Sequence, residues 1–130
     1  METALILADT SVLIDFFRKS DKSNSYLINL IKKGHVFSIS AITEYEIYSG
    51  TTGEQKLYWQ DFLKIIEVLP FDKKAVKIAV EINNDLKRKR KQIDIADLFI
   101  AATAISNQIP LATLNTKHFE RIESLNLITK

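Results

Sequence analysis

The first regular element reads Ala4-Leu5-Ile6-Leu7-Ala8, and the chain then turns polar at Asp9-Thr10-Ser11. A short, almost wholly apolar run is typical of a parallel strand that is buried on both faces. In open α/β sheets, ligands bind beyond the carboxyl ends of such strands. Asp9 directly follows this strand, and it is therefore the first candidate for a functional residue.

Strands and helices alternate along the rest of the chain. After the strand at residues 4–8 we expect strands at residues 36–40, 65–69, 110–114 and 125–129. We expect helices at residues 11–17, 24–33, 41–49, 53–63, 94–107 and 118–122, and one more that Asp72 caps and that runs into residues 87–91. This alternation predicts an α/β sandwich with a mainly parallel sheet.

Length and composition limit the possible classes of protein. The chain has 130 residues and no cysteine, so we expect one domain over residues 1–130 whose metal ligands are oxygen atoms or histidine. We find neither a secretory leader nor an apolar run of about 18 residues. We therefore expect a soluble, cytoplasmic protein without a membrane partner.

Acidic residues recur where the predicted elements meet one edge of the sheet. Asp9 follows the first strand, Glu46 lies in the helix after the second strand, and Asp94 and Asp97 open the helix at residues 94–107. A Thr113-Leu114-Asn115 corner follows the fourth strand. Because gathered carboxylates repel each other unless a cation compensates them, this pattern favours a divalent metal site and a metal-dependent phosphodiester hydrolase.

Each of these residues also has a purely structural interpretation. Asp9 and Asp94 are at positions where they could cap helices, and Thr43-x-x-Glu46 fits a capping box. Glu44 competes with Glu46, although the helical wheel favours Glu46 weakly. Asp97 could face solvent on one stripe of an otherwise apolar helix, but burying it without compensation would cost several kcal/mol.

The positive charge is concentrated in one basic segment. This segment has five consecutive basic residues, whereas the net charge of the whole chain is only +2, so the rest of the chain is net negative. Such a cluster attracts nucleic-acid backbones, or else it complements the C-terminal dipole of the preceding helix. The segment consists of Lys87, Arg88, Lys89, Arg90 and Lys91.

Four ordered motifs that together span nearly the whole chain resemble the PIN domain, and within it the VapC-type toxins of toxin–antitoxin pairs. The motifs are Asp9-Thr10-Ser11-Val12-Leu13-Ile14-Asp15, Ile39-Ser40-Ala41-Ile42-Thr43-Glu44-Tyr45-Glu46, Ile95-Ala96-Asp97-Leu98-Phe99-Ile100-Ala101-Ala102-Thr103-Ala104 and Leu111-Ala112-Thr113-Leu114-Asn115.

This resemblance implies a three-layer α/β/α sandwich and an endoribonuclease that depends on Mg²⁺ or Mn²⁺. Asp9, Glu46 and Asp97 fall on the acidic positions that hold metal, and Asn115 takes the fourth catalytic position, where aspartate is frequent. An amide oxygen binds Mg²⁺ more weakly than a carboxylate does, so Asp94 becomes a further candidate ligand.

The resemblance also implies roles for neighbouring residues and partners. Thr10, Ser11 and Thr113 would orient the carboxylates or a bound water through hydrogen bonds. The basic segment would contact the RNA substrate. We further expect a homodimer and a cognate antitoxin that occupies a groove near the site. Candidates to line that groove, unless they are ordinary core residues, are Phe16, Phe17, Tyr45, Tyr48 and Trp59.

Two other functions stay open at this point. One is a non-catalytic PIN-like module that binds RNA or acts as a scaffold. The other is a phosphotransfer domain with Asp9 as nucleophile, but the second aspartate that such a site needs two residues on is replaced by Ser11. Neither His35 nor His118 suits the role of general base, so a histidine-driven ribonuclease is not expected.

Overall fold

The computed structural model describes residues 4–128, and its strands form one parallel sheet in the order β3-β2-β1-β4. The strands are β1 (Ala4–Ala8), β2 (His35–Ser40), β3 (Val68–Leu69) and β4 (Leu111–Ala112). The helices are α1 (Thr10–Arg18), α2 (Tyr26–Lys32), α3 (Ala41–Ser49), α4 (Gly53–Leu63), α5 (Lys73–Lys89), α6 (Ile95–Ser106) and α7 (Thr116–Phe119), with a short 3-10 turn η1 (Lys22–Asn24).

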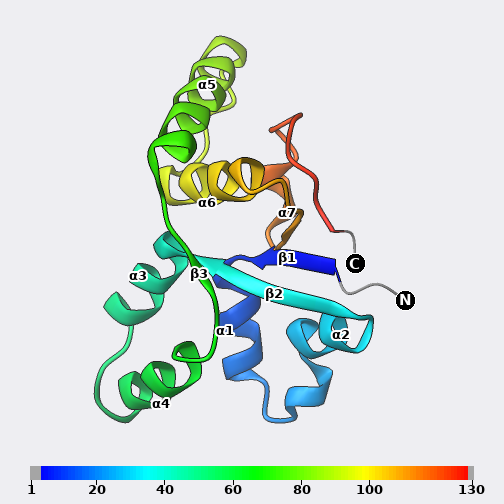
Figure 1. The fold of residues 1–130 in the computed structure, drawn as a ribbon, viewed down its shortest axis with the longest axis vertical. Coiled ribbons are helices and arrows are strands. Elements are labelled where there is room, and N and C mark those ends of the chain that lie inside the picture. Colours follow the sequence, from blue (N-terminus) through cyan, green and yellow to red (C-terminus); the bar gives the residue numbers. More distant parts are fainter. Residues whose placement is uncertain (1–3, 129–130) are drawn as a thin grey trace.

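The helices cover both faces of the sheet, which confirms the α/β/α sandwich. Figure 1 shows α1, α2 and α4 on one face and α5, α6 and α7 on the other. Side chains of β1 alternate between two apolar cores, because Ile6 and Ala8 pack with α1 to α4 whereas Leu7 packs with α5 and α6. All three of these side chains are fully buried, as the apolar run at residues 4–8 predicts.

Polar caps start the helices that leave the sheet edge. The Asp9 carboxylate accepts a hydrogen bond from the amide of Val12 at the start of α1, and the Ser40 hydroxyl accepts one from the amide of Thr43 at the start of α3. The alternative interpretation of Thr43 and Glu46 as a capping box is therefore wrong, since Ser40 caps the helix and the Glu46 carboxylate accepts from Thr10 instead.

Strand ends differ most from the expectations. The bounds of β1 are as predicted, but β3 and β4 have two residues each. Residues 65–67 belong to the turn after α4 and not to β3, whereas β4 begins after Pro110, which has no N–H to donate, and ends before Thr113. The expected edge strand at residues 125–129 is wrong over its described part, where a single parallel bridge joins Leu127 to Leu111. Its last residue, Thr129, lies outside the described residues.

The strand order creates a topological switch point where the chain changes direction across the sheet. From β1 the chain moves outward to β2 and β3, and then it returns to β4 on the other side of β1. Ligands of open α/β sheets bind at such a switch point, between the carboxyl ends of the two diverging strands. Over residues 4–128, no helix is both long enough and apolar enough to cross a membrane.

Candidate active site

Asp9 lies at this switch point, where β1 ends beside β4. Its amide donates a hydrogen bond to the carbonyl of Ala112 over 3.1 Å, and only 4% of the residue is exposed. The Ser11 hydroxyl donates to Oδ1 of the carboxylate, and the Thr113 hydroxyl donates to Oδ2. Both carboxylate oxygens are therefore held in place.

The same two hydroxyls connect Asp9 to the corner after β4. The Leu114 amide donates to the Ser11 hydroxyl over 3.0 Å, and the Asn115 amide donates to the Thr113 hydroxyl over 2.9 Å. Each hydroxyl accepts from a backbone N–H and donates to one oxygen of Asp9. This double relay fixes the orientation of the carboxylate and the position of the corner together.

Glu46 reaches the site from α3. Thr10 donates a hydrogen bond from its hydroxyl to Oε1 of Glu46 over 2.6 Å, and the same hydroxyl lies 3.1 Å from the hydroxyl of buried Thr43. Because Thr10 follows Asp9 in the sequence, this contact brings α3 to the carboxyl end of β1. The helical wheel, which favoured Glu46 over Glu44, pointed to the carboxylate that makes this contact.

Asp97 enters from the first turn of α6, and its side chain is 21% exposed. Its Oδ2 lies 3.3 Å from Nδ1 of His118, and the Asn115 side-chain nitrogen lies 3.3 Å from the same ring atom. His118 thus belongs to the site although its sequence position was not assigned a role there. The signal was the spacing of three residues between Asn115 and His118, which a single helical turn brings together.

Burial and charge together shift the ionisation of Asp9. Burial raises the pKa of its carboxyl group above the usual value, and the hydrogen bonds from Ser11, Thr113 and Val12 oppose this shift without cancelling it. The negative charge of Asp97 raises the pKa further, so the two carboxylates interact although they belong to different elements. A cation between them would relieve this repulsion.

Oxygen donors for such a cation come from three elements, but they are not drawn together into a tight cluster. Within residues 4–128, no group of three or more His, Cys, Asp and Glu side chains is close enough to hold a metal ion. The contacts instead form three subsets, which are Asp9 with Ser11 and Thr113, Glu46 with Thr10 and Thr43, and Asp97 with Asn115 and His118.

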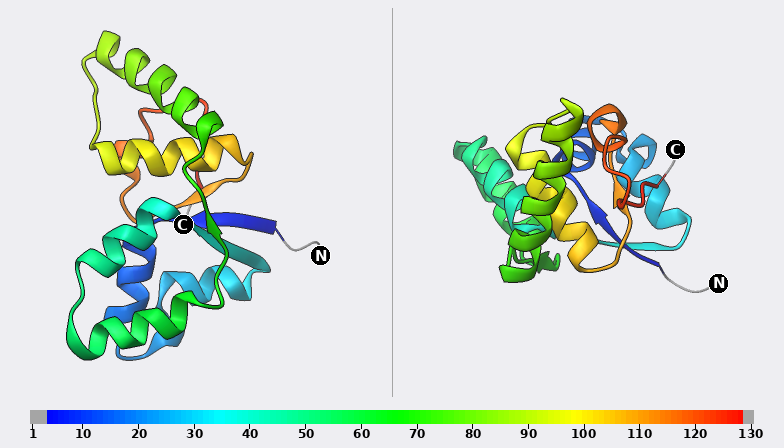
Figure 2. Two further views of the ribbon diagram at one scale, coloured as in Figure 1. Left: turned by 60° about the vertical axis from the view of Figure 1, so that its left-hand side comes forward. Right: turned by 90° about the horizontal axis from the view of Figure 1, so that it is seen from above.

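The remaining predicted site residues lie apart from these subsets. Asp94 occupies the N-cap position of α6, but it is exposed and its side chain makes no capping hydrogen bond. The basic segment ends α5, which Figures 1 and 2 show extending away from the sheet. There Arg88 and Lys89 pair with Asp85, and Lys89 also pairs with Glu123.

Comparison with known proteins gives one consistent result. The family model of the PIN domain matches residues 6–125. The protein named ribonuclease VapC1 of Methanocaldococcus jannaschii is 37% identical over 127 residues, which cover 97% of this chain and 87% of that protein.

Solved structures with the same fold agree. The VapBC2 structure from Rickettsia felis, bound to a DNA fragment from its promoter, superposes with a TM-score of 0.81 at 28% identity and covers 95% of this chain and 97% of its own. A toxin–antitoxin complex from Klebsiella pneumoniae has a TM-score of 0.75 at 25% identity, with 95% and 96% covered.

Proposed function

Because this chain belongs to the PIN domain family, we propose that it is an endoribonuclease that hydrolyses RNA phosphodiester bonds and acts as the toxin of a toxin–antitoxin pair. The observation that carries the proposal is that carboxylates from three elements are linked around the end of β1: the charge of Asp97 acts on buried Asp9, and Thr10, the next residue after Asp9, donates a hydrogen bond to Glu46. Close relatives named as ribonucleases, aligned over nearly the whole chain, support the same activity.

The chemistry of these donors fits Mg²⁺ or Mn²⁺. Hard divalent cations take oxygen ligands, and the mutual repulsion of Asp9 and Asp97 is what a cation would neutralise. In our proposal Asp9, Asp97 and Glu46 hold the metal, with Asp94 and the Asn115 amide as further oxygen donors. When bound, such an ion lowers the pKa of a coordinated water and offsets negative charge on the phosphate.

The side chains around the carboxylates prepare them for this role. Ser11 and Thr113 donate hydrogen bonds to the two oxygens of Asp9, so the orientation of its carboxylate is fixed before any ligand binds. Thr10 satisfies Oε1 of Glu46, which leaves Oε2 as the oxygen that can bind a ligand. His118 contacts Oδ2 of the Asp97 carboxylate, and the side chain of Asn115 contacts the same ring nitrogen of His118.

The test is cleavage of total RNA by purified protein, with Mg²⁺ or Mn²⁺ and with EDTA, for wild type and Asp97→Asn. We expect cleavage by wild type with metal only and a loss of at least 100-fold in the variant, because an amide cannot replace the charge of the carboxylate. Asp61→Asn is the matched control, since Asp61 makes only an exposed ion pair with Lys64 on α4.

Each outcome separates the possible functions. Cleavage that survives EDTA, or an Asp97→Asn variant as active as Asp61→Asn, would contradict the metal-dependent site. If folded, antitoxin-free protein binds RNA but cleaves none of it, the chain is a non-catalytic RNA-binding or scaffold module instead.

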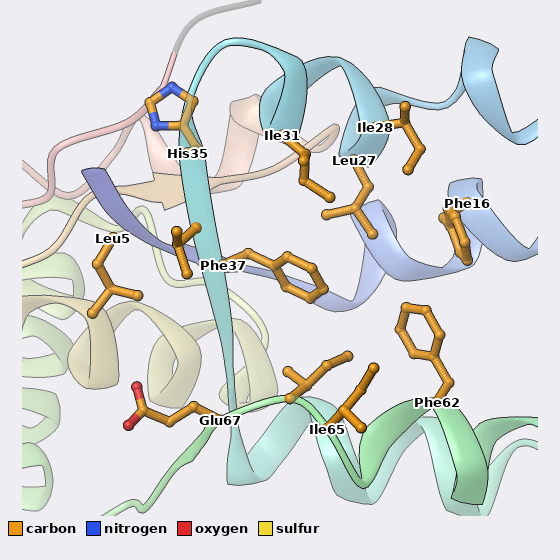
Figure 3. Close-up of a pocket in the computed structure, with 12 residues that line it drawn as sticks. Leu5, Phe16, Leu27, Ile28, Ile31, His35, Phe37, Phe62, Ile65 and Glu67 are labelled. Atoms are coloured by element: carbon orange, nitrogen blue, oxygen red, sulfur yellow. The ribbon is translucent and has the colours of Figure 1, made fainter. Parts of the chain in front are cut away.

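An apolar pocket on the face covered by α1 to α4 suits the antitoxin that we propose as the partner. The pocket has a volume of about 490 Å³ and lies between α2, β2 and the end of α4, as Figure 3 shows. Its lining includes Ile65, which is 87% exposed, and Val36, which is 50% exposed. Exposed apolar surface of this kind marks an interaction site, and relatives of the same fold are solved as complexes with antitoxins.

Of the aromatic residues expected to line a groove, only Phe16 lines this pocket. Trp59 is fully buried in the core, and Tyr45 is 71% exposed on α3. We propose that an apolar segment of the antitoxin docks in the pocket. Co-purification with the antitoxin should fail for Ile65→Asp and persist for Leu57→Asp, whose side chain is 64% exposed on α4 but lies outside the pocket. Equal retention by both variants would place the antitoxin elsewhere.

We also propose a homodimer. Val76 and Val80 lie one helical turn apart on α5 and are 45% and 55% exposed, so they offer an apolar stripe to a second copy. Light scattering should give twice the chain mass for wild type and the monomer mass for Val76→Asp/Val80→Asp. A monomeric wild type would contradict this proposal and leave the ribonuclease assignment untouched.

A further inference from the structure

Two neighbouring depressions lie along α1 and α2, and one of them reaches the candidate active site. The first has a volume of about 540 Å³ and reaches Thr10 and Ser11, whereas the second has about 350 Å³ and follows α2 as far as Lys33. They share three lining residues, which are Asp15, Lys19 and Leu114. We call this surface the α1–α2 channel, because these two helices pack side by side and form most of its walls.

The channel opens directly onto the residues that hold the carboxylates. Thr10 and Ser11, at one end of it, donate hydrogen bonds to Glu46 and Asp9. The backbone amide of Leu114, in the shared part, donates a hydrogen bond to the Ser11 hydroxyl. Tyr26 lies farther along the wall. Burial raises the pKa of its hydroxyl, and the negative charge of Asp9 raises it further. A ligand that fills the channel would therefore have one end at the candidate active site.

The lining is strongly cationic. It contains four basic side chains, Arg18, Lys19, Lys32 and Lys33, and one acidic side chain, Asp15. Asp15 is already engaged, because it accepts a hydrogen bond from the Tyr26 amide and lies 3.7 Å from Lys19. None of the ion pairs within residues 4–128 involves Arg18, Lys32 or Lys33, so their charges remain available to a ligand.

The basic segment at residues 87–91 differs from the channel in its ion pairs and in its position. Arg88 and Lys89 are paired with Asp85, and Lys89 also with Glu123, so part of their charge is already compensated. The segment also ends a helix that extends away from the sheet in both views (Figures 1 and 2). Proximity in sequence to Asp94 therefore does not give it the closer connection to the carboxylates.

We propose that the α1–α2 channel binds the RNA strand that leads to the scissile phosphate, with Lys32 and Lys33 contacting its backbone. This rests on the proposed ribonuclease function and adds the path of the substrate. Lysines bind phosphates as point charges and release condensed counterions, a contribution that does not depend on base sequence. Asn24 and Asn29 line the same wall and offer hydrogen bonds to sugars or base edges.

The test measures binding of a fluorescent single-stranded RNA over a range of salt concentrations, in the Asp97→Asn background that blocks cleavage. Lys32→Gln/Lys33→Gln removes two channel cations, and Lys87→Gln/Lys91→Gln removes two cations of the basic segment. For single strands each phosphate contact contributes roughly 0.7 to the slope of log affinity against log salt. We expect the channel variant to lose about 1.4 from that slope and the control variant to keep it.

Crosslinking provides a second measurement that needs no change in the channel. RNA carrying 4-thiouridine, bound to the Asp97→Asn protein, should crosslink under ultraviolet light to peptides that contain residues 10–33 or Leu114. Crosslinks confined to residues 85–92, or a slope lowered only in the control variant, would overturn the proposal. So would a channel variant that binds RNA normally but no longer binds the antitoxin, because the channel would then be a protein interface.

These outcomes are distinguishable from failure of the proposed function. If wild type cleaves RNA with Mg²⁺ or Mn²⁺ and the channel variant cleaves and binds it equally well, only the path of the RNA is wrong. If wild type neither cleaves nor binds RNA, the ribonuclease assignment itself fails.

Discussion

At the scale of single residues, the site is organised by hydroxyl groups rather than by ion pairs. The hydroxyls of Ser11 and Thr113 each accept a hydrogen bond from a backbone N–H and donate one to an oxygen of Asp9. The Thr10 hydroxyl orients Glu46 in the same manner by donating to its Oε1. Such polar contacts are rigid only while every member is satisfied. Removing one hydroxyl should therefore affect stability and activity together.

Thr113→Val tests this relay. The change leaves Oδ2 of buried Asp9 and the Asn115 amide without their partner, so we expect a loss of about 1–3 kcal/mol in the free energy of unfolding. We expect cleavage to fall by roughly 10- to 100-fold, as for other groups that orient metal ligands. Urea denaturation and initial cleavage rates measure the two effects. Thr113→Ser keeps the hydroxyl and should restore both, so a serine variant as impaired as valine would point to packing instead.

The raised pKa of Asp9 makes a prediction about pH. The folded state holds this proton more tightly than the unfolded chain does, because burial disfavours the charged carboxylate. The contribution of Asp9 to stability therefore falls as pH rises through the raised pKa, and it stays low above it. In EDTA, the melting temperature of wild type relative to that of Asp9→Asn should therefore fall as pH rises from about 4 toward 7. A difference between the two that does not change with pH would contradict this account.

At the scale of elements, caps decide where the helices leave the sheet edge and hence where their carboxylates go. Ser40 starts α3 by accepting from the Thr43 amide, and Asp72 starts α5 in the same way by accepting from the Ala75 amide. Only the first of these helices carries one of the candidate carboxylates, Glu46. The pair therefore separates the effect of a cap on stability from its effect on the site.

Ser40→Ala and Asp72→Ala should each cost about 1 kcal/mol in the free energy of unfolding. Only Ser40→Ala should also lower cleavage, because the Ser40 hydroxyl lies 3.3 Å from the hydroxyl of Thr43, which in turn contacts Thr10. Thermal denaturation and cleavage assays of both variants check this. Equal loss of activity in both would mean that helix stability, and not the hydroxyl chain, sets the activity.

At the scale of the whole molecule, the carboxylates that we propose as metal ligands come from residues 9, 46 and 97, so they can approach one another only in the folded chain. A ligand that needs all of them binds the folded state and not the unfolded state. At a concentration of 100 times its dissociation constant, Mg²⁺ or Mn²⁺ should therefore raise the free energy of unfolding by about 2.7 kcal/mol. Thermal denaturation with and without the ion measures this. The rise should disappear in Asp97→Asn and persist in Asp61→Asn, and a rise that is equal in both would place the ion elsewhere.

The order of strands and helices up to β4 and the bounds of β1, α3 and α4 were predictable from the sequence, as were the positions of Asp9, Glu46 and Asp97 relative to these elements, because apolar periodicity and the residues at element ends are local properties. Only the tertiary structure decided which hydroxyl holds which carboxylate, that His118 contacts Asp97, and that Arg18 and Lys19 line the same depression as Thr10 and Ser11. These features depend on the distances between segments that are remote in the sequence. The residue pattern within one segment predicts its own secondary structure, but it does not give its distance from another segment.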